Sequence, residues 1–257
     1  MRLLFIRHGD PDYEHDTLTE QGVLEAEALA AFIGRLNPGT CYVSPLGRAD
    51  LTARIALKPL GIVPAMKMWL QEFPARIDTE GSPVYQAAFP DARMPDGSWR
   101  RHILWDMVPS YYAAHPELAE PEGWRNADVV RDSDMLPRYE EVAAGLDELL
   151  ASYGYVRRDR YYEVRRETTE TVTFFCHYGI SSVLLSRLFF TSPFVPLHKL
   201  CMQTTSVTEV VTEEREPGVA TFRALRIGDT THLTLAGMEP SFAARFREVY
   251  SDTSKRG

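Results

Sequence analysis

Short apolar runs that alternate with amphipathic stretches constrain the fold of this chain most. Residues 3–6 are wholly apolar, and residues 171–176 form a nearly continuous run of β-forming residues. Runs of this length and composition are typical of strands that are buried on both faces, as in parallel sheets covered by helices. Because such strands alternate here with helical patterns, we expect an α/β chain folded as a three-layer α/β/α sandwich with a mostly parallel central sheet.

Helix signals lie between the expected strands. A helix is expected from Thr19, whose side chain can cap it, to about Leu36. Ser44 and Pro45 are expected to cap and open a second helix that ends near Gly61. The other expected elements are strands over residues 41–43 and 65–70, helices over 137–153 and 180–190, and a hairpin of 206–212 with 220–227.

The length allows one large domain or two small ones. The chain has 257 residues, of which 44% are hydrophobic, as in ordinary packed proteins. The regular pattern is lost after residue 72, where prolines, glycines and aromatic residues mix with charged ones. We therefore expect a single domain over residues 1–257 with an inserted cap at about 73–137.

The overall charge excludes some classes of partner. A formal net charge of −8 argues against nucleic-acid binding, which needs clustered lysine and arginine. No apolar stretch approaches the roughly 18 residues of a membrane span, so we expect no membrane partner. Cys41, Cys176 and Cys201 are too few and too unpatterned for a disulfide framework or a zinc site. They are interpreted as free thiols, and the protein is expected to be cytoplasmic.

Cationic and imidazole side chains follow the expected strands. Arg7 and His8 come where the first strand ends, and His177 follows the strand over residues 171–176. Arg48 lies in the first turn of a helix, just beyond another strand. Ligands of α/β sheets bind outside the carboxyl ends of the strands, and a helix start with an arginine binds anions. The sequence therefore predicts a phosphate pocket at this edge of the sheet.

The same residues belong to segments with a recognisable pattern. The segments are LLFIRHG at 3–9, LTEQG at 18–22, VSPLGRADLTA at 43–53, TFFCHYG at 173–179 and, more weakly, GDTTHL at 228–233. In kind and order they resemble the histidine phosphatase superfamily, which has the phosphoglycerate mutase-like fold. The resemblance implies that His8 is the phosphorylated nucleophile and that Arg7, Arg48 and His177 hold the phosphoryl group.

A proton donor for the leaving group is implied by the same resemblance. The family places a carboxylic acid shortly after the third strand, and Glu72 in WLQEFPARI occupies that place. Asp10, Glu80 and Asp106 are less favoured alternatives, and a surface role for Glu72 stays open. The scheme needs no cofactor and no metal ion.

The expected activity is a metal-independent phosphomonoester hydrolase that forms a phosphohistidine from a small phosphorylated metabolite and releases inorganic phosphate. A catalytically silent member that binds a phosphorylated ligand or partner is one alternative. A phosphoglycerate-type mutase is another. The chain departs from many family members after RHG, where it has Asp-Pro-Asp-Tyr at residues 10–13.

Substrate recognition is expected from loops above the strand ends, chiefly from the insertion. Solvated charge and local packing explain the candidate residues there equally well. The possible substrate-binding residues are Asp10, Tyr178, Trp99, Arg100 and His102. The oligomeric state is open, although the hairpin at 206–227 could supply a sheet edge for a dimer.

Overall fold

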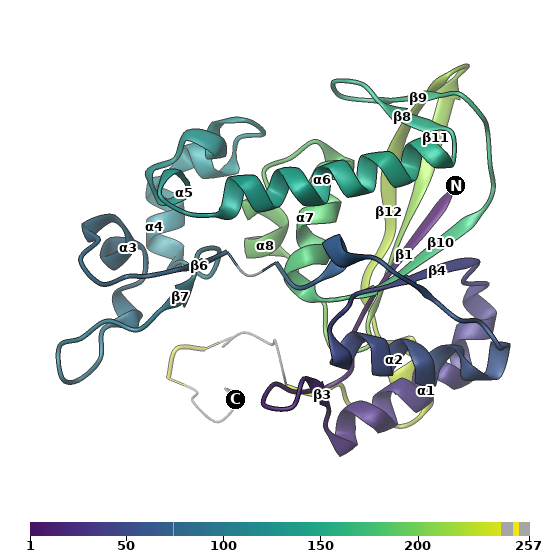
Figure 1. Ribbon diagram of the computed structural model, residues 1–257, viewed down its shortest axis with the longest axis horizontal. Coiled ribbons are helices and arrows are strands. Elements are labelled where there is room, and N and C mark those ends of the chain that lie inside the picture. The colour runs from purple at the N-terminus through teal and green to yellow at the C-terminus, as the bar shows by residue number, and fades with distance from the viewer. Residues whose placement is uncertain (74, 243–248, 252–257) are drawn as a thin grey trace. The chain divides into compact units, whose positions relative to one another are not determined.

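The computed structural model describes residues 1–73, 75–242 and 249–251 and divides into two compact units (Figure 1). Unit 1 comprises Met1–Glu72, Ala151–Ser181 and Cys201–Gly257, and unit 2 comprises Phe73–Leu150 and Ser182–Leu200. The expectation of one domain with a cap at about 73–137 stays a prediction.

Unit 1 is built on an eight-stranded sheet. In the order of the sheet, its strands are β5 (Ala65–Met66), β4 (Thr40–Val43), β10 (Thr171–Cys176), β1 (Arg2–Arg7), β11 (Val207–Glu216), β12 (Val219–Asp229), β9 (Tyr162–Val164) and β8 (Tyr155–Arg157). The first four are mutually parallel, and β11, β12, β9 and β8 add an antiparallel half. The expected α/β class with a parallel core is therefore confirmed.

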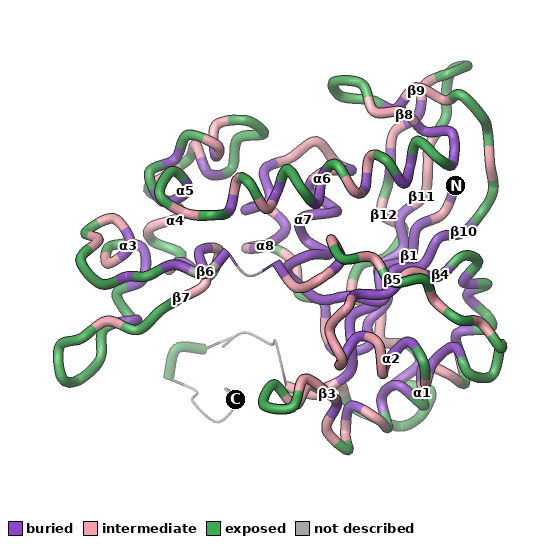
Figure 2. Tube along the Cα trace, viewed as in Figure 1, coloured by how far each residue is buried: buried purple, intermediate pink, exposed green. Residues whose placement is uncertain are grey.

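The central strands are buried on both faces (Figure 2). Leu4 and Ile6 of β1 pack into the cluster formed with helices α1 (Glu20–Leu36) and α2 (Gly47–Leu57). Phe5 points to the opposite face, since side chains alternate along a strand, and it stacks on Phe174 with ring centroids 5.2 Å apart. Burial of both faces is what the middle layer of the expected sandwich requires.

Helix α1 begins and ends close to the expected positions. The Thr19 hydroxyl caps it by accepting a hydrogen bond from the Gly22 N–H at 3.0 Å. Asn37 follows the helix in the left-handed conformation, with φ of 46°, and its N–H donates to the Gly34 carbonyl.

Helix α2 corrects one expectation. Ser44 does not cap it, because the helix begins at Gly47 after Leu46, and Leu46 makes no side-chain cap. The Ser44 hydroxyl instead lies 2.7 Å from Nε2 of His177. The end of this segment agrees with expectation, because Gly61 closes the short 3-10 helix Lys58–Leu60 that follows α2.

Three further expectations about strands need correction. The strand expected over 65–70 is only Ala65–Met66, because a 3-10 helix follows at Met68–Leu70. Strands β8 and β9 were not expected, since each has only three residues. The hairpin of β11 and β12 forms as expected but is not a sheet edge at its turn, because β9 pairs with Val219 and Ala220. The strands at the two ends of the sheet are β5 and β8.

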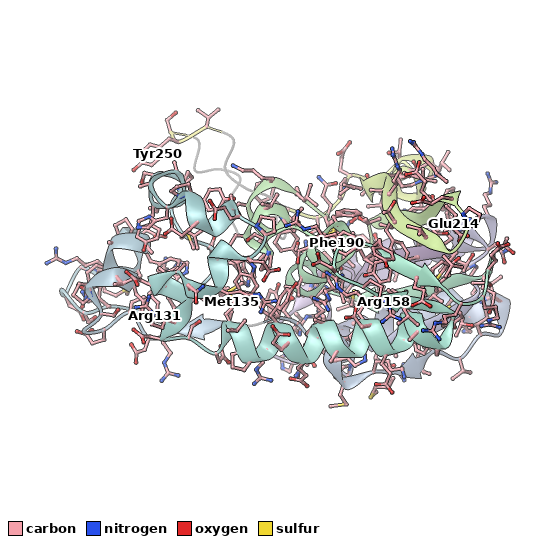
Figure 3. All side chains as sticks on the ribbon, turned by 90° about the horizontal axis from the view of Figure 1, so that it is seen from above. Arg131, Met135, Arg158, Phe190, Glu214 and Tyr250 are labelled. Carbon is pink, nitrogen blue, oxygen red and sulfur yellow. The ribbon has the colours of Figure 1, made fainter. Side chains whose placement is uncertain are left out.

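Unit 2 consists mainly of short elements. They are β6 (Arg76–Ile77), α3 (Pro83–Ala88), β7 (His102–Ile103), α4 (Pro109–Ala114), α5 (Asp128–Arg131), α6 (Met135–Ser152) and α8 (Phe194–Lys199), together with Ser182–Phe189 of α7 (Tyr178–Phe189). Arg131 and Met135 in Figure 3 mark the end of α5 and the start of the long α6. Trp124 is buried against Tyr139 and Phe194, so part of the aromatic content of this region forms a small core.

In the part of the chain that the structure describes, no helix has the length and apolar character that crossing a bilayer demands.

Candidate active site

The candidate active site of unit 1 lies where β1 and β10 end. Arg7 and Cys176 are register partners in these parallel strands, so the next residues, His8 and His177, emerge side by side. Their ring centroids are 5.0 Å apart, and the rings are tilted by 58°. The sheet register therefore brings the two predicted histidines together at the edge where ligands of α/β sheets bind.

His8 is held through its backbone and its ring. Its N–H donates to the Cys176 carbonyl at 3.0 Å, and its carbonyl accepts from the Thr205 N–H at 3.1 Å. Nδ1 lies 2.7 Å from the Gly9 carbonyl oxygen. A carbonyl only accepts hydrogen bonds, so Nδ1 carries the proton and Nε2 keeps the lone pair.

The electrostatic surroundings keep this imidazole neutral. Burial holds the pKa of His8 well below its ordinary value, the charges of Arg7 and Arg48 lower it further, and the hydrogen bond to Gly9 opposes them. A neutral imidazole with a lone pair on Nε2 is a competent nucleophile near pH 7.

The loop after His8 requires glycine for a close approach of two backbones. A Cβ on Gly9 would lie 2.6 Å from the Gly22 carbonyl oxygen, and a Cβ on Gly22 would lie 2.2 Å from that of Asp10. The Gly9 N–H also donates to the Thr52 hydroxyl at 3.0 Å, and Thr52 donates to the Arg48 carbonyl at 2.7 Å. Three of the sequence segments that carry the resemblance therefore pack directly on one another.

Arg7 and Arg48 bring positive charge into this buried region. Arg7 is 4% exposed, and its Nη1 donates to the Met202 carbonyl at 2.8 Å. Burial lowers the pKa of Arg7, while the neighbouring Tyr13 and Glu72 raise it. Arg48 is 8% exposed and lies in the first turn of α2.

Asp16 and Tyr13 hold the Arg48 side chain. Nη1 of Arg48 lies 2.5 Å from Oδ1 of Asp16, whose Oδ2 accepts from the Gly47 N–H at 2.7 Å. The guanidinium lies 5.3 Å from the centroid of the Tyr13 ring. Nε of Arg48 is buried and has no hydrogen-bond partner among the described residues. Sequence reasoning missed Asp16, since it belongs to none of the recognised segments.

In His177, as in His8, one ring nitrogen makes a hydrogen bond within the described part of the protein and the other does not. Its Nε2 lies 2.7 Å from the Ser44 hydroxyl, and within the described residues its buried Nδ1 has no hydrogen-bond partner. Burial places the pKa of His177 well below its ordinary value, and His8, Arg48 and Arg7 lower it further. A buried polar atom left open in this way is typical of a site that awaits a ligand.

The side chain of Glu72 contacts the N-terminal turn of α7, the helix that follows His177. Its Oε1 accepts from the Ile180 N–H at 3.1 Å, and its charge is felt by Arg7 and Cys176. The carboxyl group is therefore in the same region as the histidines, and its role as the proton donor stays a prediction. The alternatives Glu80 and Asp106 belong to unit 2.

Asp10 is engaged on both carboxylate oxygens. Oδ2 accepts from the Thr19 hydroxyl at 2.7 Å, and Oδ1 accepts from the Ser241 hydroxyl. The buried Glu25 completes this network by accepting from the Asp10 N–H at 2.9 Å and from the Ser241 N–H at 2.8 Å. These contacts give Asp10 a structural role, and substrate binding by Asp10 stays a prediction.

The other possible substrate-binding residues fall in different places. Tyr178 is buried as the first residue of α7 and lies near enough to Arg7 to raise the pKa of that arginine, against the larger lowering by burial. Trp99, Arg100 and His102 belong to unit 2. There the Trp99 N–H donates to Glu80 at 3.1 Å, Arg100 lies 3.5 Å from Asp91, and His102 stacks on Phe89.

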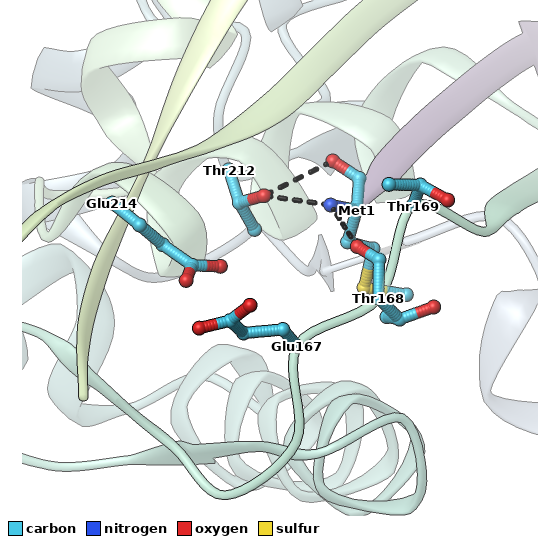
Figure 4. A pocket seen from close by; sticks show the side chains of 6 residues that line it. All are labelled: Met1, Glu167, Thr168, Thr169, Thr212 and Glu214. Atoms are coloured by element: carbon cyan, nitrogen blue, oxygen red, sulfur yellow. Dashed lines mark hydrogen bonds between the residues drawn. The ribbon is translucent and has the colours of Figure 1, made fainter. Parts of the chain in front are cut away.

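A hollow of about 600 Å³ at the other end of β1 has a different character (Figure 4). The Met1 ammonium group donates there to the Thr168 carbonyl and the Thr212 hydroxyl, both at 2.7 Å. The carboxylates of Glu167 and Glu214 face one another nearby (Figure 4). The lining contains two glutamates and neither arginine nor histidine, and its one cation, the Met1 ammonium, already donates to Thr168 and Thr212, so its charge does not favour a phosphate.

No group of three or more histidine, cysteine, aspartate or glutamate side chains is placed to hold a metal ion in residues 1–73, 75–242 and 249–251. The expectation that the reaction needs no metal stays a prediction.

Residues 3–97 match the family model described as histidine phosphatase superfamily (branch 1). This match includes His8, Arg7, Arg48 and Glu72. No curated protein sequence matches the chain.

Solved structures share the fold over nearly the whole chain. Phosphoserine phosphatase from Entamoeba histolytica in complex with 3-phosphoglyceric acid is 18% identical and covers 90% of this chain and 98% of its own, with a TM-score of 0.55. Mycobacterial glucosyl-3-phosphoglycerate phosphatase with inorganic phosphate is 19% identical over 90% of this chain and 98% of its own, with a TM-score of 0.56. Alpha-ribazole phosphatase from Shigella flexneri is 18% identical and covers 90% of this chain and 97% of its own, with a TM-score of 0.51.

The resemblance inferred from the sequence is thereby confirmed. Residues 3–97 carry the sequence pattern of the histidine phosphatase superfamily, and the chain has the phosphoglycerate mutase-like fold.

Proposed function

We propose that this protein is a phosphomonoester hydrolase that acts on a small phosphorylated metabolite through a phosphohistidine at His8. The observation that carries the proposal is the state of the His8 ring, which is neutral, has its lone pair on Nε2 and lies beside His177 and two buried arginines. Phosphoryl transfer proceeds through a transition state with spread negative charge, which positioned cations stabilise.

The first step transfers the phosphoryl group to the enzyme. Nε2 of His8 attacks phosphorus, the P–O bond of the ester breaks, and the leaving alkoxide takes a proton from the carboxyl group of Glu72. Arg7, Arg48 and His177 contact the phosphoryl oxygens and stabilise their charge. The helix start beside Glu72 favours a carboxylate, whereas a bound phosphate dianion favours the protonated form that donates.

The second step releases phosphate. A water molecule attacks phosphorus and gives its proton to the Glu72 carboxylate, the P–N bond breaks, and inorganic phosphate leaves. Nε2 recovers its lone pair, because Nδ1 has kept its proton on the Gly9 carbonyl throughout. The cycle ends with Glu72 protonated for another substrate.

The class of substrate rests on the similar structures. Their names give phosphoserine, glucosyl-3-phosphoglycerate and alpha-ribazole phosphate esters as substrates, and one was solved with inorganic phosphate. These support a small phosphorylated metabolite for this chain as well. A screen of sugar phosphates, phosphoamino acids, phosphoglycerates and nucleotides identifies which one.

The experiment compares the full chain with two histidine variants on para-nitrophenyl phosphate, with and without a chelator. His8→Ala is expected to abolish turnover, and the activity of the wild type is expected to be the same with and without the chelator. His15→Ala is the matched control, because His15 is exposed and pairs with Asp12 in the short hairpin of β2 (Pro11–Asp12) and β3 (Thr17–Leu18). An acid-labile phosphoenzyme is expected in the wild type after rapid quenching and is expected to be absent in His8→Ala.

Other outcomes separate the alternatives. Chelator-sensitive activity that survives His8→Ala would contradict the mechanism. Tight phosphate binding without turnover on the whole panel favours a silent binding protein, and activity that requires a bisphosphate primer favours a mutase.

The compartment is part of the proposal. Cys41 and Cys176 are buried free thiols and Cys201 is an exposed one. Free thiols of this kind support a reducing compartment such as the cytoplasm, which cell fractionation tests directly.

A further inference from the structure

Ser44 lies beside the second histidine of the candidate site. Its N–H donates to the Phe175 carbonyl at 3.0 Å, which extends the pairing of β4 with β10 by one residue. The side chain is fully buried, and its Oγ lies 2.7 Å from Nε2 of His177. This position is set by the parallel sheet, since Ser44 directly follows β4 and His177 directly follows the neighbouring β10.

The direction of the hydrogen bond between Ser44 and His177 follows from the donors and acceptors around the hydroxyl. A serine hydroxyl has one hydrogen to donate and two lone pairs that accept. Oγ of Ser44 accepts from the Leu46 N–H at 3.2 Å. If Nε2 of His177 also donated to Oγ, the buried hydroxyl hydrogen would have no acceptor among the described residues. The hydroxyl therefore donates to Nε2, which must carry a lone pair.

The other ring nitrogen then carries the hydrogen. A neutral imidazole has one N–H, so a lone pair on Nε2 puts the hydrogen of His177 on Nδ1. Nδ1 is buried and, in the described part of the chain, has no hydrogen-bond partner. A buried donor without an acceptor is unfavourable unless a ligand supplies one. A phosphoryl oxygen bound beside His8 is such an acceptor.

We propose that Ser44 is a positioning residue that holds His177 in the Nδ1–H tautomer, so that a neutral imidazole donates a hydrogen bond to the phosphoryl group. The proposal rests on the proposed function, because it deepens the role of the same site.

The two histidines then share one tautomer and present opposite groups to the substrate. His8 has its Nδ1–H occupied by the Gly9 carbonyl and presents the lone pair of Nε2 to phosphorus. His177 has its Nε2 lone pair occupied by Ser44 and presents the Nδ1–H to an oxygen. One ring is prepared to attack and the other to bind, and neither needs to be charged.

The direct test is a long-range ¹H–¹⁵N correlation spectrum of the full chain labelled with ¹⁵N-histidine, recorded at pH 7. His177→Gln assigns the signals of His177. The wild type is expected to show the Nδ1–H tautomer at His177, and Ser44→Ala is expected to shift it toward Nε2–H. Ser44→Thr keeps a hydroxyl and is expected to keep the tautomer. The wild-type spectrum decides the point even if Ser44→Ala fails to fold.

Binding provides the second readout, with inorganic phosphate and orthovanadate as probes. Ser44→Ala is expected to weaken both about 10- to 100-fold, in proportion to one lost charge-assisted hydrogen bond. Ser186→Ala is the matched control, because that serine is equally buried but donates only to the Val183 carbonyl within α7.

The outcomes separate this proposal from the proposed function. An Nε2–H tautomer in the wild type, or probe affinities that Ser44→Ala leaves unchanged, would overturn the role of Ser44 whether or not the enzyme turns over substrate. Absence of turnover with the expected tautomer and a Ser44-dependent phosphate affinity would overturn hydrolysis and leave the role of Ser44 intact.

Discussion

The residues expected to do chemistry and the residues expected to select a substrate lie on very different kinds of structure. In unit 1, His8 and His177 follow two six-residue strands that are paired along their whole length. In unit 2, Arg100 lies between an isolated bridge formed by Trp99 and the two-residue strand β7. Strands that are paired along many residues fix the positions of the catalytic side chains that follow them. Short elements and loops can change in sequence with little loss of core stability.

The arginine expected to bind phosphate is also more deeply buried than the arginine expected to select a substrate. The Arg48 side chain is 10% exposed and paired with Asp16, whereas the Arg100 side chain is 54% exposed and lies 3.5 Å from Asp91. Charges in a buried region interact strongly, and exposed pairs contribute little because water and ions screen them. Substitutions in unit 1 should therefore affect activity far more than comparable substitutions in unit 2.

The largest effect is expected from Arg48→Ala. Removing a buried cation from the phosphoryl group is expected to lower kcat/KM for para-nitrophenyl phosphate about 10³-fold. Arg54→Ala is the matched control on the same helix, because Arg54 is exposed and pairs with Asp50. Steady-state kinetics measure both variants, and similar losses in the two would contradict the placement of Arg48 in the site.

The next effect is expected from Glu72→Gln and depends on the leaving group. An alkyl phosphate needs a proton on its leaving oxygen, so its kcat is expected to fall about 10²-fold. Para-nitrophenolate leaves without help, and its first step is expected to change much less. Single-turnover rates with both substrates measure the difference. Equal losses on the two would remove Glu72 from the role of proton donor.

A smaller effect is expected on stability as the pH falls. Burial lowers the pKa of His232 in unit 1 and of His198 in unit 2 to about 4 in each case. The ordinary histidine pKa in an unfolded chain is about 6.5, so below that pH the unfolded state binds more protons and the folded state loses stability. The loss is about 1.4 kcal/mol per pH unit for each histidine at most.

Urea denaturation at pH 7, 6 and 5 measures this loss. His232→Gln is expected to flatten the dependence of the unfolding free energy on pH between pH 6 and 5, and His198→Gln is expected to do the same in unit 2. A pH dependence equal to that of the wild type in both variants would show that neither histidine is neutral in the folded protein.

The smallest effect is expected from Arg100→Ala. This variant is expected to raise KM for an anionic metabolite a few-fold and to leave para-nitrophenyl phosphate within about twofold, as for an exposed charge. Arg131→Ala is the matched control in unit 2, where Arg131 is exposed and pairs with Asp128 on its own helix. If the two variants behaved alike on every substrate, Arg100 would have no part in selecting one.

Much of unit 1 could be predicted because its signals are local. The apolar run before Arg7, the cap at Thr19 and the turn between β11 and β12 each depend on a few neighbouring residues. The prediction of a strand over 65–70 was wrong in its length, because only two residues of that segment pair with β4. Short edge strands such as β8 and β9 carry too few residues for a pattern.

The site divides in the same way. The order of residues alone predicts that His8 and His177 directly follow strands and that Arg48 lies at a helix start, because strand ends and helix starts can be recognised from local apolar periodicity. The contacts of Ser44 with His177 and of Asp16 with Arg48 became visible only in the folded structure. These pairs are 133 and 32 residues apart in the chain. No local pattern encodes such contacts, since the sheet register and the packing of the first loop bring the partners together.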